Sequence, residues 1–235
     1  MGVCIITGAS SGIGRAVSKA IVKNDWFESY ALIGRNLEDL NIVVNEIKEE
    51  HPNILVELYI CDFRDPKSIK KLIKDIMIDK TEISCLMNIA GYTDPQALLT
   101  TSYESFELTY KVNVFTPFLL IRECVKYMRK TGGKILNVAS TAGMSPRPGW
   151  VSYASSKAAI ISISQTLAEE LAEYGIKVYC VSPGRCATKL RKRLAPDEDP
   201  TTIMQPEEVA NIICDLIKPS EHCLDGQNIV IRKKI

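Results

Sequence analysis

Short apolar runs alternate with longer amphipathic segments along almost the whole of the 235-residue chain. The runs lie at residues 3–6, 30–33, 55–60, 83–87, 134–138, 177–182 and 228–232. Helical patterns occupy residues 14–23, 37–50, 66–79, 102–130, 153–174 and 206–217. Such alternation is typical of a parallel sheet, because parallel strands need a crossover between them and the crossovers cover both faces. We therefore predict a doubly wound α/β fold, as one large domain or alternatively two small ones.

The composition is that of an ordinary globular protein, with 46% hydrophobic residues, 24% charged residues and a formal net charge of +1. This balance gives no support for a nucleic-acid-binding protein, which usually carries a strong basic excess. No apolar run approaches the roughly 20 residues that span a bilayer, so we expect no membrane association. The chain starts directly with the strand-like run Val3 to Ile6 and shows no signal peptide. We therefore expect a cytoplasmic location.

The eight cysteines form no Cys-x-x-Cys motif, since no two of them are three positions apart. Four lie in strand-like apolar runs, where a free thiol behaves as a small buried hydrophobe; these are Cys4, Cys61, Cys85 and Cys180. The only histidines, His51 and His222, stand in polar contexts. A zinc site and a histidine-dependent triad are therefore not expected, and we predict no metal.

A glycine-rich turn joins the first strand to the first helix. It reads Thr7-Gly8-Ala9-Ser10-Ser11-Gly12-Ile13-Gly14. Glycines permit a tight turn and a close approach of the backbone to a pyrophosphate, while the helix N-terminus offers free N–H groups. We predict that Gly8, Ser10, Ser11, Gly12, Ile13 and Gly14 bind a dinucleotide. The alternative is a strand-to-helix turn without a ligand.

Arginine follows the second strand, in the sequence Gly34-Arg35-Asn36. An NAD-binding protein usually places an acidic residue here for the ribose hydroxyl. A carboxylate would repel a 2′-phosphate, whereas Arg35 can pair with it and Arg15 lies nearby. We therefore predict NADP(H) rather than NAD(H). The alternative is that Arg35 is only a solvated surface residue.

Tyr153 and Lys157 are four residues apart, which places them one turn apart on the same face of a helix. A lysine ammonium at this position favours the phenolate form of the tyrosine. Ser140 follows a β-branched run and can reach the same space. A hydroxyl that holds a carbonyl oxygen, a tyrosine with an acidified proton and a nearby cation make a proton-transfer site. The dinucleotide would supply the electrons.

Polar and small residues gather where the predicted strands end, at Ser10, Gly34, Asp62, Asn88, Ser140 and Pro183. Ligands of doubly wound sheets bind outside the carboxyl ends of the strands, so these positions predict one shared site. Asp62 would accept from an adenine amino group or cap the next helix. The small residues Ala90 and Gly91 would let the backbone run close to a cofactor. Asn113, in the middle of a predicted helix, marks a local irregularity.

Together the motifs resemble those of the short-chain dehydrogenase/reductase family over essentially the whole chain. The set is Thr7-Gly8-x-x-x-Gly12-x-Gly14, Asp62, Asn88-x-Ala90-Gly91, Asn113, Ser140, Tyr153-x-x-x-Lys157 and Pro183-Gly184-x-x-x-Thr188. The resemblance implies a single Rossmann-type domain over residues 1–235 with a seven-stranded sheet, and a homodimer or homotetramer. One departure is Ile89, where many members carry a second asparagine.

The resemblance also implies roles for individual residues. Tyr153 would be the general acid in carbonyl reduction, and Lys157 would lower its pKa and bind the nicotinamide ribose. Ser140 would orient the substrate oxygen, and Asn113 would hold a water that links Lys157 to solvent. The remaining predicted cofactor contacts are Asp62, Phe63, Asn88, Ala90, Gly91, Pro183, Gly184 and Thr188.

A polar segment at about 184–205 is predicted to be a loop that covers the substrate. It carries five cations in nine residues, namely Arg185, Lys189, Arg191, Lys192 and Arg193. We predict that Arg185, Lys189 and Arg191 bind an anionic group, which indicates a small phosphorylated ketose or polyol as substrate. Three alternatives are a solvated mobile lid, a reductase of 3-ketoacyl thioesters or neutral carbonyls, and a non-catalytic dinucleotide-binding regulator.

Overall fold

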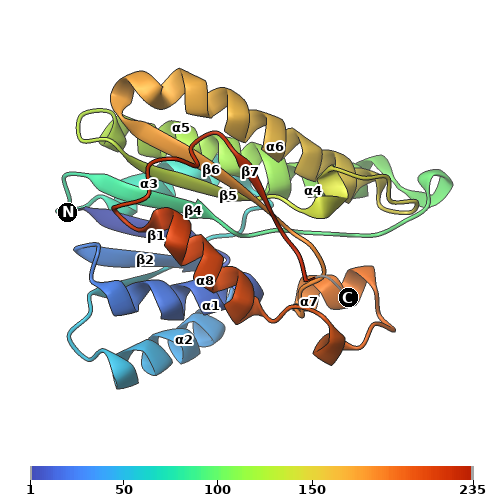
Figure 1. Cartoon of the computed structure of the whole chain (residues 1–235), viewed down its shortest axis with the longest axis horizontal. Coiled ribbons are helices and arrows are strands. Elements are labelled where there is room, and N and C mark those ends of the chain that lie inside the picture. Colours follow the sequence, from blue (N-terminus) through green and yellow to red (C-terminus); the bar gives the residue numbers. More distant parts are fainter. Residues whose placement is uncertain (1, 234–235) are drawn as a thin grey trace.

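Seven parallel strands form one sheet, drawn as arrows in Figure 1. The computed structural model describes residues 2–233. The strands are β1 Val3–Thr7, β2 Ser29–Gly34, β3 Val56–Ile60, β4 Ile83–Asn88, β5 Gly133–Val138, β6 Ile176–Pro183 and β7 Asn228–Ile231. They lie in the order β3-β2-β1-β4-β5-β6-β7, and every neighbouring pair is parallel. The predicted seven-stranded parallel sheet is confirmed.

Helices cover both faces of this sheet (Figure 1). The α-helices are α1 Gly12–Ile21, α2 Leu37–Glu50, α3 Ile69–Ile76, α4 Tyr103–Tyr110, α5 Thr116–Met128, α6 Val151–Leu171, α7 Lys189–Leu194 and α8 Pro206–Ile217. One apolar core joins the sheet to α1, α2 and α8, and a second joins it to α3, α5 and α6. Within residues 2–233, no helix combines the length and apolar character that crossing a bilayer requires.

The central strands are apolar without interruption because both of their faces are buried. In β1, Cys4 and Ile6 belong to the core beneath α1 and α8, while Val3 and Ile5 belong to the opposite core. All four side chains are at most 1% exposed. Side chains alternate between the faces of a strand, so each face of β1 contributes to a different core.

The cysteines agree with the prediction made from the sequence. All eight carry free thiols, and Cys4, Cys61, Cys85 and Cys180 are buried. Burial raises the pKa of the Cys180 thiol to about 11, which keeps it neutral.

The helix predicted over residues 102–130 is wrong as a single unit. It is divided into α4 and α5 by a π-helical turn, Lys111–Phe115. Asn113 lies inside this turn, so the irregularity predicted at that residue is confirmed. Such turns are rare and occur often at functional sites.

The prediction of a loop over 184–205 also needs correction. The segment contains α7 and a short 3₁₀ turn, Pro200–Thr202. The Thr188 hydroxyl caps α7 by accepting the Arg191 N–H at 3.1 Å, and the Asp199 carboxylate accepts the Thr201 N–H at 2.9 Å. Local capping by these side chains makes helical turns out of a sequence whose charge and proline content indicated a loop.

Two glycines of the glycine-rich turn, Gly8 and Gly14, occupy positions that a larger residue would not fit. Gly8 has φ +69°, a left-handed conformation that favours glycine. A Cβ at Gly14 would lie 2.1 Å from the Gly8 carbonyl oxygen, so α1 touches the turn backbone to backbone. By contrast, a Cβ at Gly91 would meet only ordinary contacts, the nearest of them the Leu190 side chain at 3.5 Å.

We expect Gly14→Ala to lower the free energy of unfolding by about 1–3 kcal/mol, because a methyl group in a filled space forces a backbone shift. Gly91→Ala is the control, and we expect it to be neutral or stabilising by less than about 1 kcal/mol. Urea unfolding of both variants tests the difference. Equal stabilities would contradict the close packing of Gly14 against Gly8.

Candidate active site

A cavity of about 550 Å³ opens at the carboxyl edge of the sheet. Its size falls in the usual range for small-molecule sites, roughly 300–1,000 Å³. Five of the predicted strand-end positions line it, namely Ser10, Gly34, Asp62, Ser140 and Pro183. The parallel topology therefore brings together residues that are far apart in sequence.

Ser140, Tyr153 and Lys157 meet at the end of β5. Ser140 begins a short 3₁₀ turn, and its hydroxyl accepts the Ala142 N–H at 3.1 Å. Tyr153 and Lys157 lie in the first turns of α6 and are 5% and 4% exposed. The Lys157 Nζ donates to the Val138 carbonyl at 2.8 Å and lies 5.8 Å from the centre of the Tyr153 ring. All three line the cavity.

Burial governs the protonation of this group. It raises the pKa of Tyr153, while hydrogen bonding with Ser140 and the charge of Arg191 lower that pKa in part. Burial also lowers the pKa of Lys157 to about 8. The tyrosine therefore holds its proton at neutral pH, as an acid must before it reacts. Arg191 is a cation that lowers the pKa of Tyr153 here, and the predicted effect of Lys157 on the tyrosine stays a prediction.

Asn113 connects the cavity wall to α6. Its Nδ2 donates to the Tyr92 carbonyl at 2.9 Å and to the Ser156 hydroxyl at 3.0 Å, and its Oδ1 accepts the Tyr92 N–H at 2.8 Å. Both amide hydrogens are thus used within the protein. Asn113 fixes the chain beside Gly91 against the helix of Tyr153, while its predicted role in holding a water stays a prediction.

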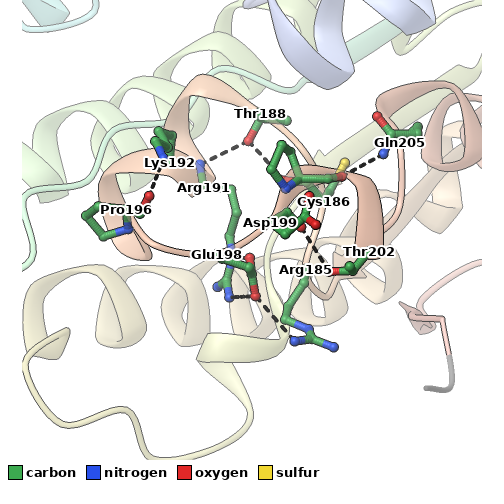
Figure 2. A network of polar contacts seen from close by, with 11 residues as sticks. Arg185, Cys186, Thr188, Arg191, Lys192, Pro196, Glu198, Asp199, Thr202 and Gln205 are labelled. Carbon is green, nitrogen blue, oxygen red and sulfur yellow. Dashed lines mark hydrogen bonds and ion pairs between the residues drawn. The ribbon is translucent and has the colours of Figure 1, made fainter.

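The cations predicted to bind substrate are largely paired with one acid (Figure 2). Glu198 accepts from Arg191 at 2.6 and 2.7 Å and from Arg185 at 3.3 Å. These arginines hold the pKa of Glu198 below its usual value. Of the three predicted residues, Lys189 has no ion pair within residues 2–233 and lines the cavity. Two of the three predicted substrate-binding cations are therefore already engaged by Glu198, and their binding of an anionic group stays a prediction.

Trp150 is a site residue that sequence reasoning missed. The Arg191 guanidinium lies 5.8 Å from the centre of the Trp150 ring, and Trp150 meets Tyr153 edge-on at 6.5 Å. The indole therefore stands between α7 and the tyrosine. A lone tryptophan in a loop carries no motif that could have identified it.

The predicted cofactor residues line the cavity, with Asn88 as the exception. Those present are Gly8, Ser10, Ser11, Gly12, Ile13, Gly14, Arg35, Asp62, Phe63, Ala90, Gly91, Tyr153, Lys157, Pro183, Gly184 and Thr188. Ser11 precedes α1 without a side-chain cap, which leaves the first N–H groups of the helix available to an anion. The tight glycine turn beside these N–H groups fits a pyrophosphate.

Asn88 requires a correction, because its side chain turns into the sheet. Its Nδ2 donates to the Asn137 Oδ1 at 2.9 Å, and the Asn137 Nδ2 donates to the Ser164 hydroxyl at 2.9 Å. The Asn88 side chain is buried and links β4 to β5. The Asn88 side chain therefore lies outside the cavity lining. The neighbouring chain is positioned by Thr7, whose hydroxyl accepts the N–H groups of Ile89 and Ala90 at 3.0 and 3.1 Å.

The far end of the cavity carries Arg35 and a pair that was not predicted, Asp62 with Arg64. The Arg64 Nε donates to the Asp62 carboxylate at 2.8 Å, and this contact lowers the pKa of Asp62. Arg35 is exposed and lines the cavity. Arg15 lies outside the cavity lining and forms an ion pair with Glu46.

Comparison with known proteins identifies the family. The sequence pattern of the short chain dehydrogenase family matches residues 2–199. A 3-oxoacyl-[acyl-carrier-protein] reductase of Thermotoga maritima is 32% identical, over 97% of this chain and 95% of its own. A 2,3-dihydro-2,3-dihydroxybenzoate dehydrogenase of Bacillus subtilis is 35% identical, over 84% of this chain and 74% of its own.

Solved structures agree. A short chain dehydrogenase from Shigella flexneri, complexed with NADP, superposes with a TM-score of 0.88 over 97% of this chain and 96% of its own, at 25% identity. Sequence and fold therefore lead to the same conclusion: the chain belongs to the short-chain dehydrogenase/reductase family of oxidoreductases, which interconvert alcohols and carbonyl compounds.

Proposed function

We propose that this oxidoreductase reduces a ketone to a secondary alcohol with NADPH, and that the ketone is a 3-oxoacyl thioester. The observation that carries the proposal is the meeting of Ser140 with the buried Tyr153 and Lys157 at the wall of one cavity, which the glycine-rich turn also lines. The 32% identity to a 3-oxoacyl reductase over nearly the whole chain supports the substrate class. The NADP-complexed relative and Arg35 support the cofactor.

The chain's own residues would divide the work as follows. NADPH, when bound, supplies the hydride that reaches the carbonyl carbon. The Ser140 hydroxyl donates a hydrogen bond to the carbonyl oxygen and orients it. The Tyr153 hydroxyl gives its proton to the same oxygen, so that C=O becomes CH–OH. The Lys157 ammonium, held by the Val138 carbonyl, stabilises the phenolate that Tyr153 becomes.

The phosphorylated ketose or polyol is the second substrate candidate. The basic segment 185–193 favours it, but Glu198 already forms ion pairs with two of the three side chains that were expected to bind the phosphate, Arg185 and Arg191. A panel that compares acetoacetyl-coenzyme A with phosphorylated ketoses, followed through NADPH oxidation, separates the two candidates.

We also propose that the protein is cytoplasmic and forms a homodimer or homotetramer. The exposed Phe115 and Phe118, at the π turn and just after it, support the oligomer.

We expect Tyr153→Phe to lower kcat by about 10²-fold or more, because the general acid is lost. The dissociation constant for NADPH should hardly change. Tyr103→Phe, at a tyrosine 74% exposed, is the matched control and should keep full activity. Full activity of Tyr153→Phe would remove the tyrosine from the mechanism, and binding of NADPH without any turnover in the wild type would favour the non-catalytic regulator.

We expect kcat/KM for carbonyl reduction to fall as the pH rises through about 8, where Lys157 loses its charge. The neutral lysine can no longer stabilise the phenolate. Tyr153 keeps its proton over the same range, because burial raises its pKa. A pH–rate profile at constant ionic strength tests this, with NADPH binding measured at each pH as the control. A level profile up to about pH 10 would contradict the role of Lys157.

We expect Arg35→Ala to raise the dissociation constant for NADPH by about tenfold, the size of one lost charge-assisted hydrogen bond, and to leave NADH binding unchanged. Fluorescence titration of both cofactors measures the effect. Arg15→Ala is the matched control, because Arg15 is tied to Glu46 outside the cavity lining. Equal affinities of the wild type for NADPH and NADH would make Arg35 a surface charge without a role in cofactor choice.

A further inference from the structure

A second cavity, of about 220 Å³, lies beside the active-site cavity. The two share part of their lining, including Thr141, Gly184 and Arg185. Its volume is below the range for a whole drug-sized ligand, roughly 300–1,000 Å³, so it suits one end group of a molecule that also enters the larger cavity. None of the residues predicted from the sequence to bind substrate, apart from Arg185, belongs to it.

Four cationic residues, all of them exposed, contribute to the lining of this small cavity. They are Arg147 from the loop after β5, Arg185 from the segment after β6, and Arg232 and Lys233 after β7. The hydroxyl-bearing residues Thr141, Ser145 and Thr202 complete the polar lining. The whole chain has a net charge of only +1, so this concentration of positive charge is local.

The walls are held together by main-chain hydrogen bonds. The Gly184 N–H donates to the Ile231 carbonyl at 2.8 Å, and the Met204 N–H donates to the Arg185 carbonyl at 3.2 Å. Ile203 and Met204, each 4% exposed, add buried apolar residues to the lining. Segments from three parts of the chain are therefore fixed around the cavity, which makes it a built feature of the fold.

Negative charge is scarce at this position. Glu198 pairs with Arg185 at 3.3 Å, while Arg147, Arg232 and Lys233 form no ion pair within residues 2–233. Like charges that face one cavity repel one another, and a bound anion turns that repulsion into attraction. Arginine in particular offers the paired N–H groups that match phosphate oxygens.

The position of the cavity separates it from the cofactor phosphates. The glycine-rich turn and Arg35 follow β1 and β2, whereas the second cavity lies by the ends of β6 and β7, on the other side of β4 and β5. An anion bound there is therefore not a phosphate of the dinucleotide. It can be a group of the substrate.

We propose that the cavity formed by Arg147, Arg185, Arg232 and Lys233 binds a phosphate group of the substrate. This inference rests on the proposed function for its account of what the phosphate carries. A 3-oxoacyl thioester of coenzyme A or of a phosphopantetheinylated carrier brings such a phosphate, and so does a small phosphorylated ketone. The chemistry that the cavity recognises is the same in each case.

The first test is independent of turnover. We expect protein saturated with NADP⁺, so that the cofactor site is filled, to bind coenzyme A and inorganic phosphate in isothermal titration. The double variant Arg232→Ala with Lys233→Ala should lose about tenfold or more in affinity for coenzyme A, because charge-assisted contacts are removed. Lys48→Ala, at an exposed lysine of α2, is the matched control and should bind as the wild type does.

The second test uses kinetics to find the source of the phosphate. We expect the double variant to raise KM for acetoacetyl-coenzyme A by about tenfold while kcat is kept, and to leave KM for the uncharged N-acetylcysteamine thioester unchanged. Acetoacetyl thioester on a carrier protein and dihydroxyacetone phosphate are the other two arms. The substrate whose KM rises most in the double variant identifies the molecule that carries the phosphate.

The outcomes separate the inference from the proposed function. If the wild type reduces thioesters while the double variant keeps the same KM and the same affinity for coenzyme A, the anion site is overturned. The proposed function then still stands. Binding of phosphate that the double variant loses, without reduction of any thioester, would support the site and refute the thioester substrate. Absence of coenzyme A and phosphate binding by the wild type would overturn the site outright.

Discussion

Because all seven strands are parallel, the chain leaves every strand at the same edge of the sheet, and the rest of the molecule depends on that constraint. The glycine-rich turn after β1, Arg35 after β2, Asp62 after β3 and Ser140 after β5 face one cavity although they are distant in sequence. The helices on both faces shield the sheet, so this edge is where the chain can combine polar groups with a hollow. Chemistry at the edge then requires few residues, each placed by the strand that it follows.

Burial at the edge determines which protonation states are available. Tyr153 and Lys157 are almost fully enclosed, and enclosure disfavours the charged form of each. The tyrosine therefore keeps its proton, and the lysine begins to lose its positive charge at mildly alkaline pH. Arg191, which lies over Trp150 and is bound to Glu198, lowers the pKa of the tyrosine in part. Helix α7 thus contributes to the electrostatics of the site as well as to the lining of the cavity.

The sequence was sufficient for those parts of the site that depend on local spacing. The Gly8 to Gly14 turn, the Tyr153 and Lys157 pair and the strand-end residues follow from short-range pattern, because backbone geometry fixes where such residues point. It was insufficient where a residue's partner lies far along the chain. The pairing of Asn88 with Asn137, the shared hold of Glu198 on Arg185 and Arg191, and the position of Trp150 are products of tertiary packing. Helix α7 was missed for a related reason, since its capping by Thr188 was hidden in a segment read only for its charge.

The π turn at Lys111–Phe115 has a consequence for the phase of the helices around it. One extra residue in a helical turn rotates everything that follows by about 100° relative to an uninterrupted α-helix. Asn113 can therefore face Tyr92 and Ser156 while Leu120, Ile121 and Cys124 of α5 face the sheet, a combination of directions that the extra residue makes compatible. Loss of one residue from this turn would swing the apolar stripe of α5 away from the core while leaving α4 in place.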